Sequence, residues 1–302
     1  METDILHEPN EKTEWNESFY FNFYDKANDV CAFMRIGLKP NKDEKSMFCF
    51  IMLPDGSYAG SRSSMPIGDN ELSVNGLSYE KIVSGKTWGL RFSGPMKIFE
   101  STGPEHGNVE FDLRFTGLDD IFNYRECVSG FNETISQSVA SEHLEQYGKV
   151  EGHMELNGKR FDINGLGERD HSWGVRDWNA PKMWIWLTAE FSEGIALNVT
   201  KLSVEQGVVD AGFFHIDGSY HPIIGADIDT VYGKNGEPLS FVMELKDKKG
   251  IVRTVDAEII RNVMLPFTSD DGNKESVMHE TLAQYEFEGM KGFGIAEYLI
   301  KK

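Results

Sequence analysis

The chain has 302 residues, of which 40% are hydrophobic and 26% are charged, so it can bury a substantial core. Its 49 acidic residues outnumber the 30 basic ones and give a formal net charge of −19. This surplus of negative charge disfavours nucleic acids and anionic membranes as partners, because both require a basic face on the protein. We therefore expect a globular protein with no nucleic-acid partner.

The N-terminal segment METDILHEPNEKTEWNES has neither a basic start nor an apolar stretch, so it does not predict a secretory signal peptide. No segment approaches the roughly 20 apolar residues that a membrane-spanning helix needs, and we expect no stable membrane insertion. Cys31, Cys49 and Cys127 are widely spaced and form no CxxC pair, which argues against disulfides and thiolate zinc sites. The simplest expectation is a cytoplasmic protein with reduced thiols.

Turn signals recur along the chain and separate segments that are typical of β-strands. Asn-Gly and Asp-Gly pairs adopt positive φ at little cost, as two-residue hairpin turns require. Such pairs lie between apolar or alternating segments at Asp55-Gly56, Asn75-Gly76, Asn157-Gly158, Asp217-Gly218 and Asn235-Gly236. The flanking segments are rich in β-branched and aromatic residues, and helical periodicity is scarce. The sequence therefore predicts an all-β protein, with two domains of barrel or sandwich type at residues 1–168 and 169–302.

His143 and Glu145 alternate in the segment EHLEQ, so on a strand both side chains lie on one face. They could form a general base or a pair that positions water; the alternative is a solvated, charged strand face. A metal site would combine them with His171. Because the sequence contains no tight cluster of ligands, we expect no metal.

The segment GLGERDHSWGVRDW, residues 165–178, contains two Arg-Asp dipeptides, a histidine and two tryptophans. Its opening Gly-x-Gly suggests a phosphate-binding loop. Asp170 stands where the nucleotide fingerprint needs a third glycine, and an acidic residue there would repel phosphate, so we reject a nucleotide site. The HExxH, GxSxG and Walker A motifs are absent as well.

Two interpretations of this segment remain open. In the first, Arg169, Asp170, Arg176 and Asp177 satisfy one another in a structural network of ion pairs at the domain junction. Buried ion pairs seldom add stability, however, so a chain that concentrates them has another use for them.

In the second interpretation the segment performs acid–base chemistry. A carboxyl group desolvated against Trp173 and Trp178 would have a raised pKa and could donate a proton, while a carboxylate paired with arginine would stay ionised. His171 would relay the proton, and the indole rings would stabilise a developing positive charge.

Further candidates follow this segment. Trp184 and Trp186 alternate in MWIWL and share a face with Thr188 and Glu190; we interpret that face as barrel interior. Glu297, in the predicted last strand GFGIAEY, is expected to pair with Arg169 or Arg176.

The segments GLGERDHSWGVRDW, HLEQYGKVEG and GFGIAEY resemble bacterial relatives of carotenoid 1,2-hydratase (hydroxyneurosporene synthase). WNESFYFNFYD and RIGLKP resemble the wider superfamily of two lipocalin-like β-domains, which includes fungal Diels–Alderases and other terpenoid cyclases. The resemblance implies two lipocalin-like barrel or sandwich domains packed together. It also implies an aromatic pocket for a hydrophobic small-molecule substrate, and no cofactor.

We interpret the chain as a cofactor-independent hydratase or dehydratase of a small terpenoid, with Asp170 or Asp177 as the acid. The alternatives are a terpenoid isomerase or cyclase, including a pericyclase, and a non-enzymatic carrier of hydrophobic ligands. The oligomeric state is left open. The catalytic candidates are Asp170, His171, Asp177, Glu145 and His143. The substrate-binding candidates are Tyr20, Trp173, Trp178, Trp184 and Trp186. The carboxylate-orienting candidates are Arg169, Arg176, Glu168 and Glu297.

Overall fold

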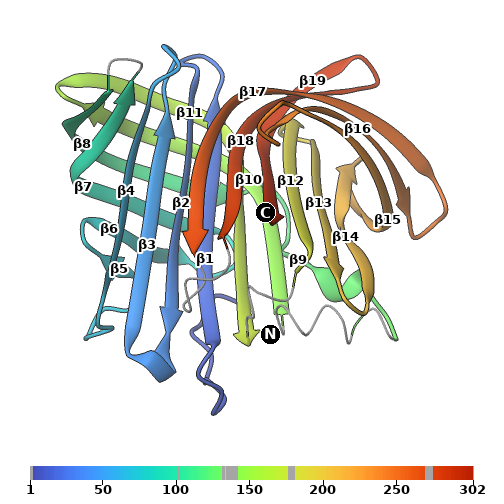
Figure 1. Ribbon diagram of the computed structural model, residues 1–302, viewed down its shortest axis with the longest axis horizontal. Coiled ribbons are helices and arrows are strands. Elements are labelled where there is room, and N and C mark those ends of the chain that lie inside the picture. The colour runs from blue at the N-terminus through green and yellow to red at the C-terminus, as the bar shows by residue number, and fades with distance from the viewer. Residues whose placement is uncertain are drawn as a thin grey trace. The chain divides into compact units, whose positions relative to one another are not determined.

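The computed structural model describes residues 3–100, 103–130, 133, 142–175, 181–268 and 275–301. Most of these residues lie in β-strands (Figure 1), which confirms the all-β prediction. Among the described residues, the helical elements with assigned bounds are two short 3₁₀ helices, η1 (Pro40–Lys42) and η2 (Tyr124–Glu126). None of the helices in these ranges is long and apolar enough to cross a membrane.

The strands group into two compact units, Met1–Ile121 with His143–Arg176, and Phe122–Glu142 with Asp177–Lys302. The first unit contains β1 (Trp15–Asp25), β2 (Val30–Lys39), β3 (Glu44–Met52), β4 (Tyr58–Met65), β5 (Ser73–Val74), β6 (Leu77–Val83), β7 (Thr87–Glu100), β8 (Gly103–Gly117), β10 (Glu142–Leu156) and β11 (Lys159–Val175). The second unit contains β9 (Phe122–Asn123), β12 (Met183–Ser192), β13 (Ile195–Val204), β14 (Gly207–Ile216), β15 (Ser219–Tyr232), β16 (Pro238–Asp247), β17 (Val252–Thr268), β18 (Glu275–Phe287) and β19 (Met290–Lys301).

The first unit is a sheet that curls back on itself. Its strands follow the order β4-β3-β2-β1-β11-β10-β8-β7-β6-β5, and a short pairing of β4 with β7 closes the sheet. Alternate residues of these strands, such as Phe19, Phe21 and Phe23 of β1, form a core cluster with Trp88 of β7. We call the face of the sheet that carries this cluster the inner face of the first unit.

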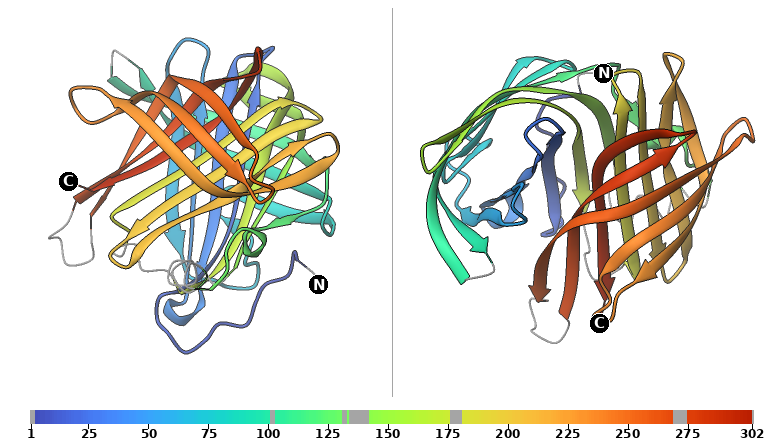
Figure 2. Two further views of the ribbon diagram at one scale, coloured as in Figure 1. Left: turned by 90° about the vertical axis from the view of Figure 1, so that its right-hand side faces the viewer. Right: turned by 90° about the horizontal axis from the view of Figure 1, so that it is seen from above.

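The second unit is a closed barrel in which β12 to β19 pair in chain order and β19 pairs with β12 (Figure 2). Its core cluster takes residues from every strand, among them Ile185 and Leu187 of β12 and Tyr298 of β19. Within the described residues, Cys31, Cys49 and Cys127 are not joined in a disulfide.

The predicted hairpin turns shape both units. Asn157 and Gly158, with φ of 50° and 81°, connect β10 to β11, and Asp217 and Gly218, with φ of 55° and 69°, connect β14 to β15. Both residues of each pair take positive φ, as the tight hairpin turns favoured by strand twist require.

Most of the dense motif is a strand and not a connection between domains. Strand β11 pairs with β1 as far as Val175, opposite Trp15, so the boundary expected between residues 168 and 169 falls inside this strand. Arg176, Asp177 and Trp178 lie outside the described residues.

The two glycines that open the motif bring β11 close to β1. A Cβ atom on Gly167 would lie 2.0 Å from the carbonyl oxygen of Asn22, and one on Gly165 would lie 2.7 Å from that of Tyr24. Both contacts involve backbone atoms, which cannot rotate away. The Gly-x-Gly pattern therefore serves strand packing, in line with the rejection of a phosphate loop.

We expect Gly167→Ala to lower the free energy of unfolding by about 3 kcal/mol, because the added methyl group forces β1 and β11 apart. Urea unfolding followed by circular dichroism measures this change. Gly94→Ala is the matched control, since its Cβ would meet nothing nearer than the Phe92 ring at 3.7 Å. Equal losses in the two variants would contradict the packing argument.

Candidate functional site

Strand β11 presents polar side chains on both of its faces. Its pairing with β1 places Arg169, His171 and Trp173 opposite Phe21, Phe19 and Glu17, respectively. Directly opposed residues of an antiparallel pair lie on the same face, so these three side chains belong to the inner face. Asp170 and Ser172 alternate with them and lie on the other face, which we call the outer face.

On the outer face, Asp170, His143 and Glu145 form a chain of hydrogen-bonded groups. The Nε2 atom of His143 lies 2.6 Å from Oδ2 of Asp170 and 2.7 Å from Oε1 of Glu145. The predicted sharing of one face by His143 and Glu145 is confirmed, and the alternative of a solvated strand face is wrong because both residues are buried. Asp170 is the most accessible member, with 13% of its side chain exposed, against 8% for His143 and none for Glu145.

The two carboxylates set the protonation state of His143. Burial by itself would lower the pKa of this imidazole, but the charge and hydrogen bond of Asp170, followed by those of Glu145, outweigh that effect and raise the pKa to about 9. His143 is therefore an imidazolium at neutral pH. The group as a whole holds one mobile proton between two carboxylates.

Hydroxyl and aromatic side chains adjoin this group on the outer face. The hydroxyl of Ser172 donates to Oδ1 of Asp170 at 2.9 Å, and Tyr20 is the residue of β1 directly opposite Asp170. The Tyr20 ring lies edge-on to Phe48 at 6.2 Å, and Phe48 in turn contacts Phe33 and Phe50. An aromatic surface thus extends from Asp170 across β1, β2 and β3.

The inner-face residues are bound by the N-terminal segment. Arg169 donates to Oδ1 of Asp4 at 2.9 Å and to Oε1 of Gln146 at 2.8 Å, and its guanidinium lies over the Trp88 ring. Burial lowers the pKa of Arg169, and the Asp4 carboxylate partly offsets this effect. The expected pairing of Arg169 with Asp170 or Glu297 is wrong, because the hydrogen bonds of Arg169 go to Asp4 and Gln146. The expected pairings that involve Arg176 or Asp177 fall outside the described residues.

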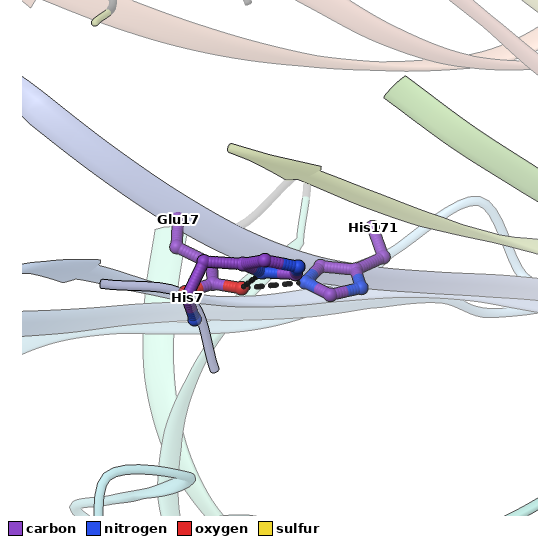
Figure 3. A group of neighbouring side chains, drawn as sticks. All are labelled: His7, Glu17 and His171. Carbon is purple, nitrogen blue, oxygen red and sulfur yellow. Dashed lines mark hydrogen bonds and ion pairs between the residues drawn. The ribbon is translucent and has the colours of Figure 1, made fainter. Parts of the chain in front are cut away.

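His171 also lies on the inner face, at one end of the sheet. Its Nε2 atom is 2.8 Å from Oε1 of Glu17, and Nδ1 of His7 is 2.7 Å from the same oxygen (Figure 3). Trp173 stacks on the His7 ring at 3.7 Å. Within the described residues, two groups have the side-chain types and spacing to hold a metal ion, namely His7-Glu17-His171 and His143-Glu145-Asp170.

This arrangement corrects two expectations about the motif. Asp170 is not shielded by Trp173, and His171 cannot relay its proton, because both lie on the opposite face of the strand. His143 takes the place that we expected for His171. A metal site that combines His143 with His171 is excluded for the same reason.

In the second unit, Trp184 and Trp186 are buried but alternate with the core residues Ile185 and Leu187. The expectation that they line the barrel interior is therefore wrong. Glu297, the residue of β19 opposite Trp186, shares their face of the sheet. In the first unit, Glu168 is buried two residues before Asp170, on the outer face.

Glu190 is the carboxyl group of β12, and its pKa is strongly shifted. It shares a face with Trp184 and Trp186, as expected, and neither of its oxygens has a hydrogen-bond partner on another described residue. Burial raises its pKa to about 8, so the side chain is a neutral acid at pH 7.

The sequence interpretation missed three residues of these groups, namely Asp4, His7 and Glu17, and it named Glu190 only as a neighbour of the two tryptophans. A signal for Glu17 was present, since it alternates with Phe19 and Phe21 and thus places a charge on a core-facing position. Applying the same alternation to residues 169–173 would have separated Asp170 from Trp173. Asp4 and His7 lie outside regular strands, where no periodicity applies.

The model of one family, described as a domain of unknown function (DUF7064), matches residues 1–302, and the chain belongs to that family. No curated protein matches the sequence. Among solved structures, CghA is similar with a TM-score of 0.61 and 9% identity, covering 96% of this chain and 88% of CghA. CghA with Sch210972 gives a TM-score of 0.62 at 8% identity, covering 96% and 89% of the two chains. Kievitone hydratase from Nectria haematococca gives 0.59 at 10% identity, covering 94% and 88%. These likenesses confirm the lipocalin-like fold.

The imidazole of His143 should titrate near pH 9 in the intact chain, because two carboxylates stabilise its charged form. Asp170→Asn should move this titration to lower pH by removing the larger of the two attractions. Nuclear magnetic resonance of the histidine ring protons measures both. Asp162→Asn, on an exposed residue of the same strand, is the control, and an unchanged titration in Asp170→Asn would contradict the assignment.

Glu190 should make the protein less stable as pH rises. Its pKa is raised in the folded state, so between pH 4.5 and about 8 the unfolded chain has already released the proton that the folded chain retains. The free energy of unfolding then falls by at most about 1.4 kcal/mol per pH unit. Glu190→Gln should remove this slope, raising stability at pH 8 and leaving it within about 1 kcal/mol near pH 4. Urea unfolding across this pH range tests the prediction, and parallel curves would refute it.

Proposed function

We propose that this member of the DUF7064 family is a cofactor-independent hydratase or dehydratase of a small terpenoid alkene or alcohol. The observation that carries the proposal is the hydrogen-bonded group of Asp170, His143 and Glu145, with Asp170 at its accessible end. Such a group can donate a proton and take one back without a cofactor.

In the direction of dehydration, the proton held between His143 and Asp170 passes to the hydroxyl oxygen of the substrate. The C–O bond breaks, water leaves, and a carbocation remains. The Asp170 carboxylate then removes a proton from the adjacent carbon, which forms the alkene, and returns that proton to His143. Glu145 stays ionised and anchors the imidazolium. Hydration is the same sequence reversed.

The aromatic surface beside Asp170 suits such a substrate. The partly exposed Phe48 ring offers apolar contact to a hydrocarbon skeleton and its face attracts a developing cation, and the buried rings of Tyr20, Phe33 and Phe50 pack around it. The Phe48 ring takes the role that we expected for Trp173, which was to stabilise a developing positive charge. Further roles in binding or orientation for Trp184, Trp186, Glu168 and Glu297, and for Arg176, Asp177 and Trp178, remain proposals.

The similarity in fold to kievitone hydratase supports a reaction of this class, since it is a hydratase by name with the same architecture. An isomerase or cyclase is the second candidate, because one residue that gives and takes back a proton can also move a double bond. A carrier of hydrophobic ligands is disfavoured by the cost of burying three ionisable groups that binding alone does not need.

The test is a panel of monoterpene and sesquiterpene tertiary alcohols, with the corresponding alkenes, incubated in ¹⁸O-labelled water. A hydratase places the label in the alcohol, an isomerase or cyclase gives unlabelled products, and a carrier binds without conversion. Label in an alcohol formed from an alkene, or loss of water from an alcohol to give the alkene, supports the proposal, and conversion only to unlabelled isomers of the same composition contradicts it.

Asp170→Asn should lower turnover by about 10²–10⁴-fold, because the amide can neither donate the proton nor take it back. Its thermal unfolding temperature should stay close to that of the wild type. Asp162→Asn makes the same change on an exposed residue of β11 and should leave turnover unaltered. If Asp170→Asn loses turnover only to the extent that it unfolds, Asp170 is a structural residue and the catalytic assignment is wrong.

A further inference from the structure

The inner-face group of His7, Glu17 and His171 has no part in the proposed reaction, because it lies on the opposite face of β11 from Asp170. It brings together one residue from the N-terminal segment, one from β1 and one from β11. Glu17 and His171 are almost fully buried, each with 1% of its side chain exposed, and His7 is 21% exposed. Three ionisable groups are therefore withdrawn from water at one point.

The hydrogen bonds of His171 require a proton or a metal ion between this residue and Glu17. Its Nδ1 atom lies 2.8 Å from the carbonyl oxygen of Thr3, and a carbonyl can only accept, so Nδ1 carries a proton. A neutral imidazole with a proton on Nδ1 has a lone pair on Nε2, which here faces a carboxylate oxygen of Glu17 at 2.8 Å. Two lone pairs at that distance repel, so either a second proton or a metal ion must lie between them.

His7 favours the metal ion. Its Nδ1 atom approaches the same Glu17 oxygen at 2.7 Å, while its backbone N–H donates to the other oxygen at 2.9 Å. Two imidazole nitrogens thus converge on one carboxylate oxygen (Figure 3). We propose that His7, Glu17 and His171 bind a divalent transition-metal ion, with zinc as the first expectation.

The ligand set selects this class of ion. Two imidazoles and one carboxylate suit zinc and its neighbours in the first transition row, whereas magnesium and calcium prefer oxygen ligands throughout. Zinc holds such ligands at roughly 2.0–2.2 Å, which in a tetrahedron separates the ligand atoms by about 3.3 Å. The separations of 2.7 and 2.8 Å therefore need to widen by about half an ångström. His7 can move by this amount because it lies on no strand.

The surroundings restrict the orientation of both rings before an ion arrives. The Thr3 carbonyl fixes the tautomer of His171, as second-shell acceptors do for histidine ligands of metals. Phe19 stacks on His171 at 4.0 Å with 18° between the ring planes, and Trp173 stacks on His7 with 10° between them. Little side-chain freedom remains to be lost when an ion binds.

A bound ion would tie the N-terminal segment to β1 and β11. Its expected effect is on stability, since an ion that binds only the folded chain raises the unfolding temperature. The reacting group on the outer face is a separate site, so this proposal does not depend on the proposed function. If the metal proposal fails, the proposed function is unaffected, and the reverse also holds.

The test uses the full chain, stripped with a chelator and then desalted. Zinc titrated in a calorimeter should bind at one ion per chain, and excess zinc should raise the unfolding temperature by about 5 °C. Cobalt(II) should give the visible absorption of a four- or five-coordinate site with nitrogen and oxygen ligands. His7→Gln should weaken zinc binding by at least about 100-fold, because it removes a direct ligand yet keeps a hydrogen-bonding side chain.

His153→Gln is the matched control, since His153 is an exposed histidine on β10 and should not affect binding. A wild-type chain that binds no stoichiometric zinc at micromolar concentration overturns the proposal, and a hydrogen bond between His171 and Glu17 then accounts for the geometry. Equal zinc affinity in the wild type and in His7→Gln overturns it as well. Because the wild-type titration is decisive by itself, the result does not depend on the folding of any variant.

Discussion

Strand β11 carries buried charged groups on both of its faces, and much of the first unit follows from the need to compensate them. A buried ionised group without a partner costs several kcal/mol, so each one must find an opposite charge or a hydrogen bond. Arg169 pairs with Asp4, His171 lies against Glu17, and Asp170 pairs with His143. These partners come from the N-terminal segment, from β1 and from β10, so the charges of one strand organise three other parts of the chain.

The alternation of side chains along β11 also gives the two faces of the motif different contacts. The inner face faces the aromatic core and holds the N-terminal segment through Arg169 and His171. The outer face presents Asp170, the most accessible member of a buried acid–base group. Adjacent residues such as Asp170 and His171 therefore serve different purposes, because consecutive side chains of a strand point in opposite directions. The inner face carries the ion pair and hydrogen bonds to the N-terminal segment, and the outer face carries the hydrogen-bonded group of Asp170, His143 and Glu145.

Glu190 in the second unit illustrates the loss of stability that a buried ionisable group causes. A neutral carboxylic acid without a partner on another described residue is a net burden on folding at neutral pH, and glutamine would relieve it. A chain that keeps this group gives up stability at that position. Buried groups of this kind are typical of functional sites, where a perturbed pKa is useful.

The sequence by itself determined the all-β class, the Asn-Gly and Asp-Gly turns and the common face of His143 and Glu145, because each depends on neighbours within a few residues along the chain. It also contained the alternation that separates Asp170 from Trp173, although we read those residues as one cluster. Only the tertiary structure decided which charges meet. Asp4 and His7 reach β11 across more than 160 positions of the sequence, and His143 reaches Asp170 through the pairing of β10 with β11. Such contacts depend on strand order and register, which no local pattern encodes, so the partners of a buried charge emerge only when the sheet has formed.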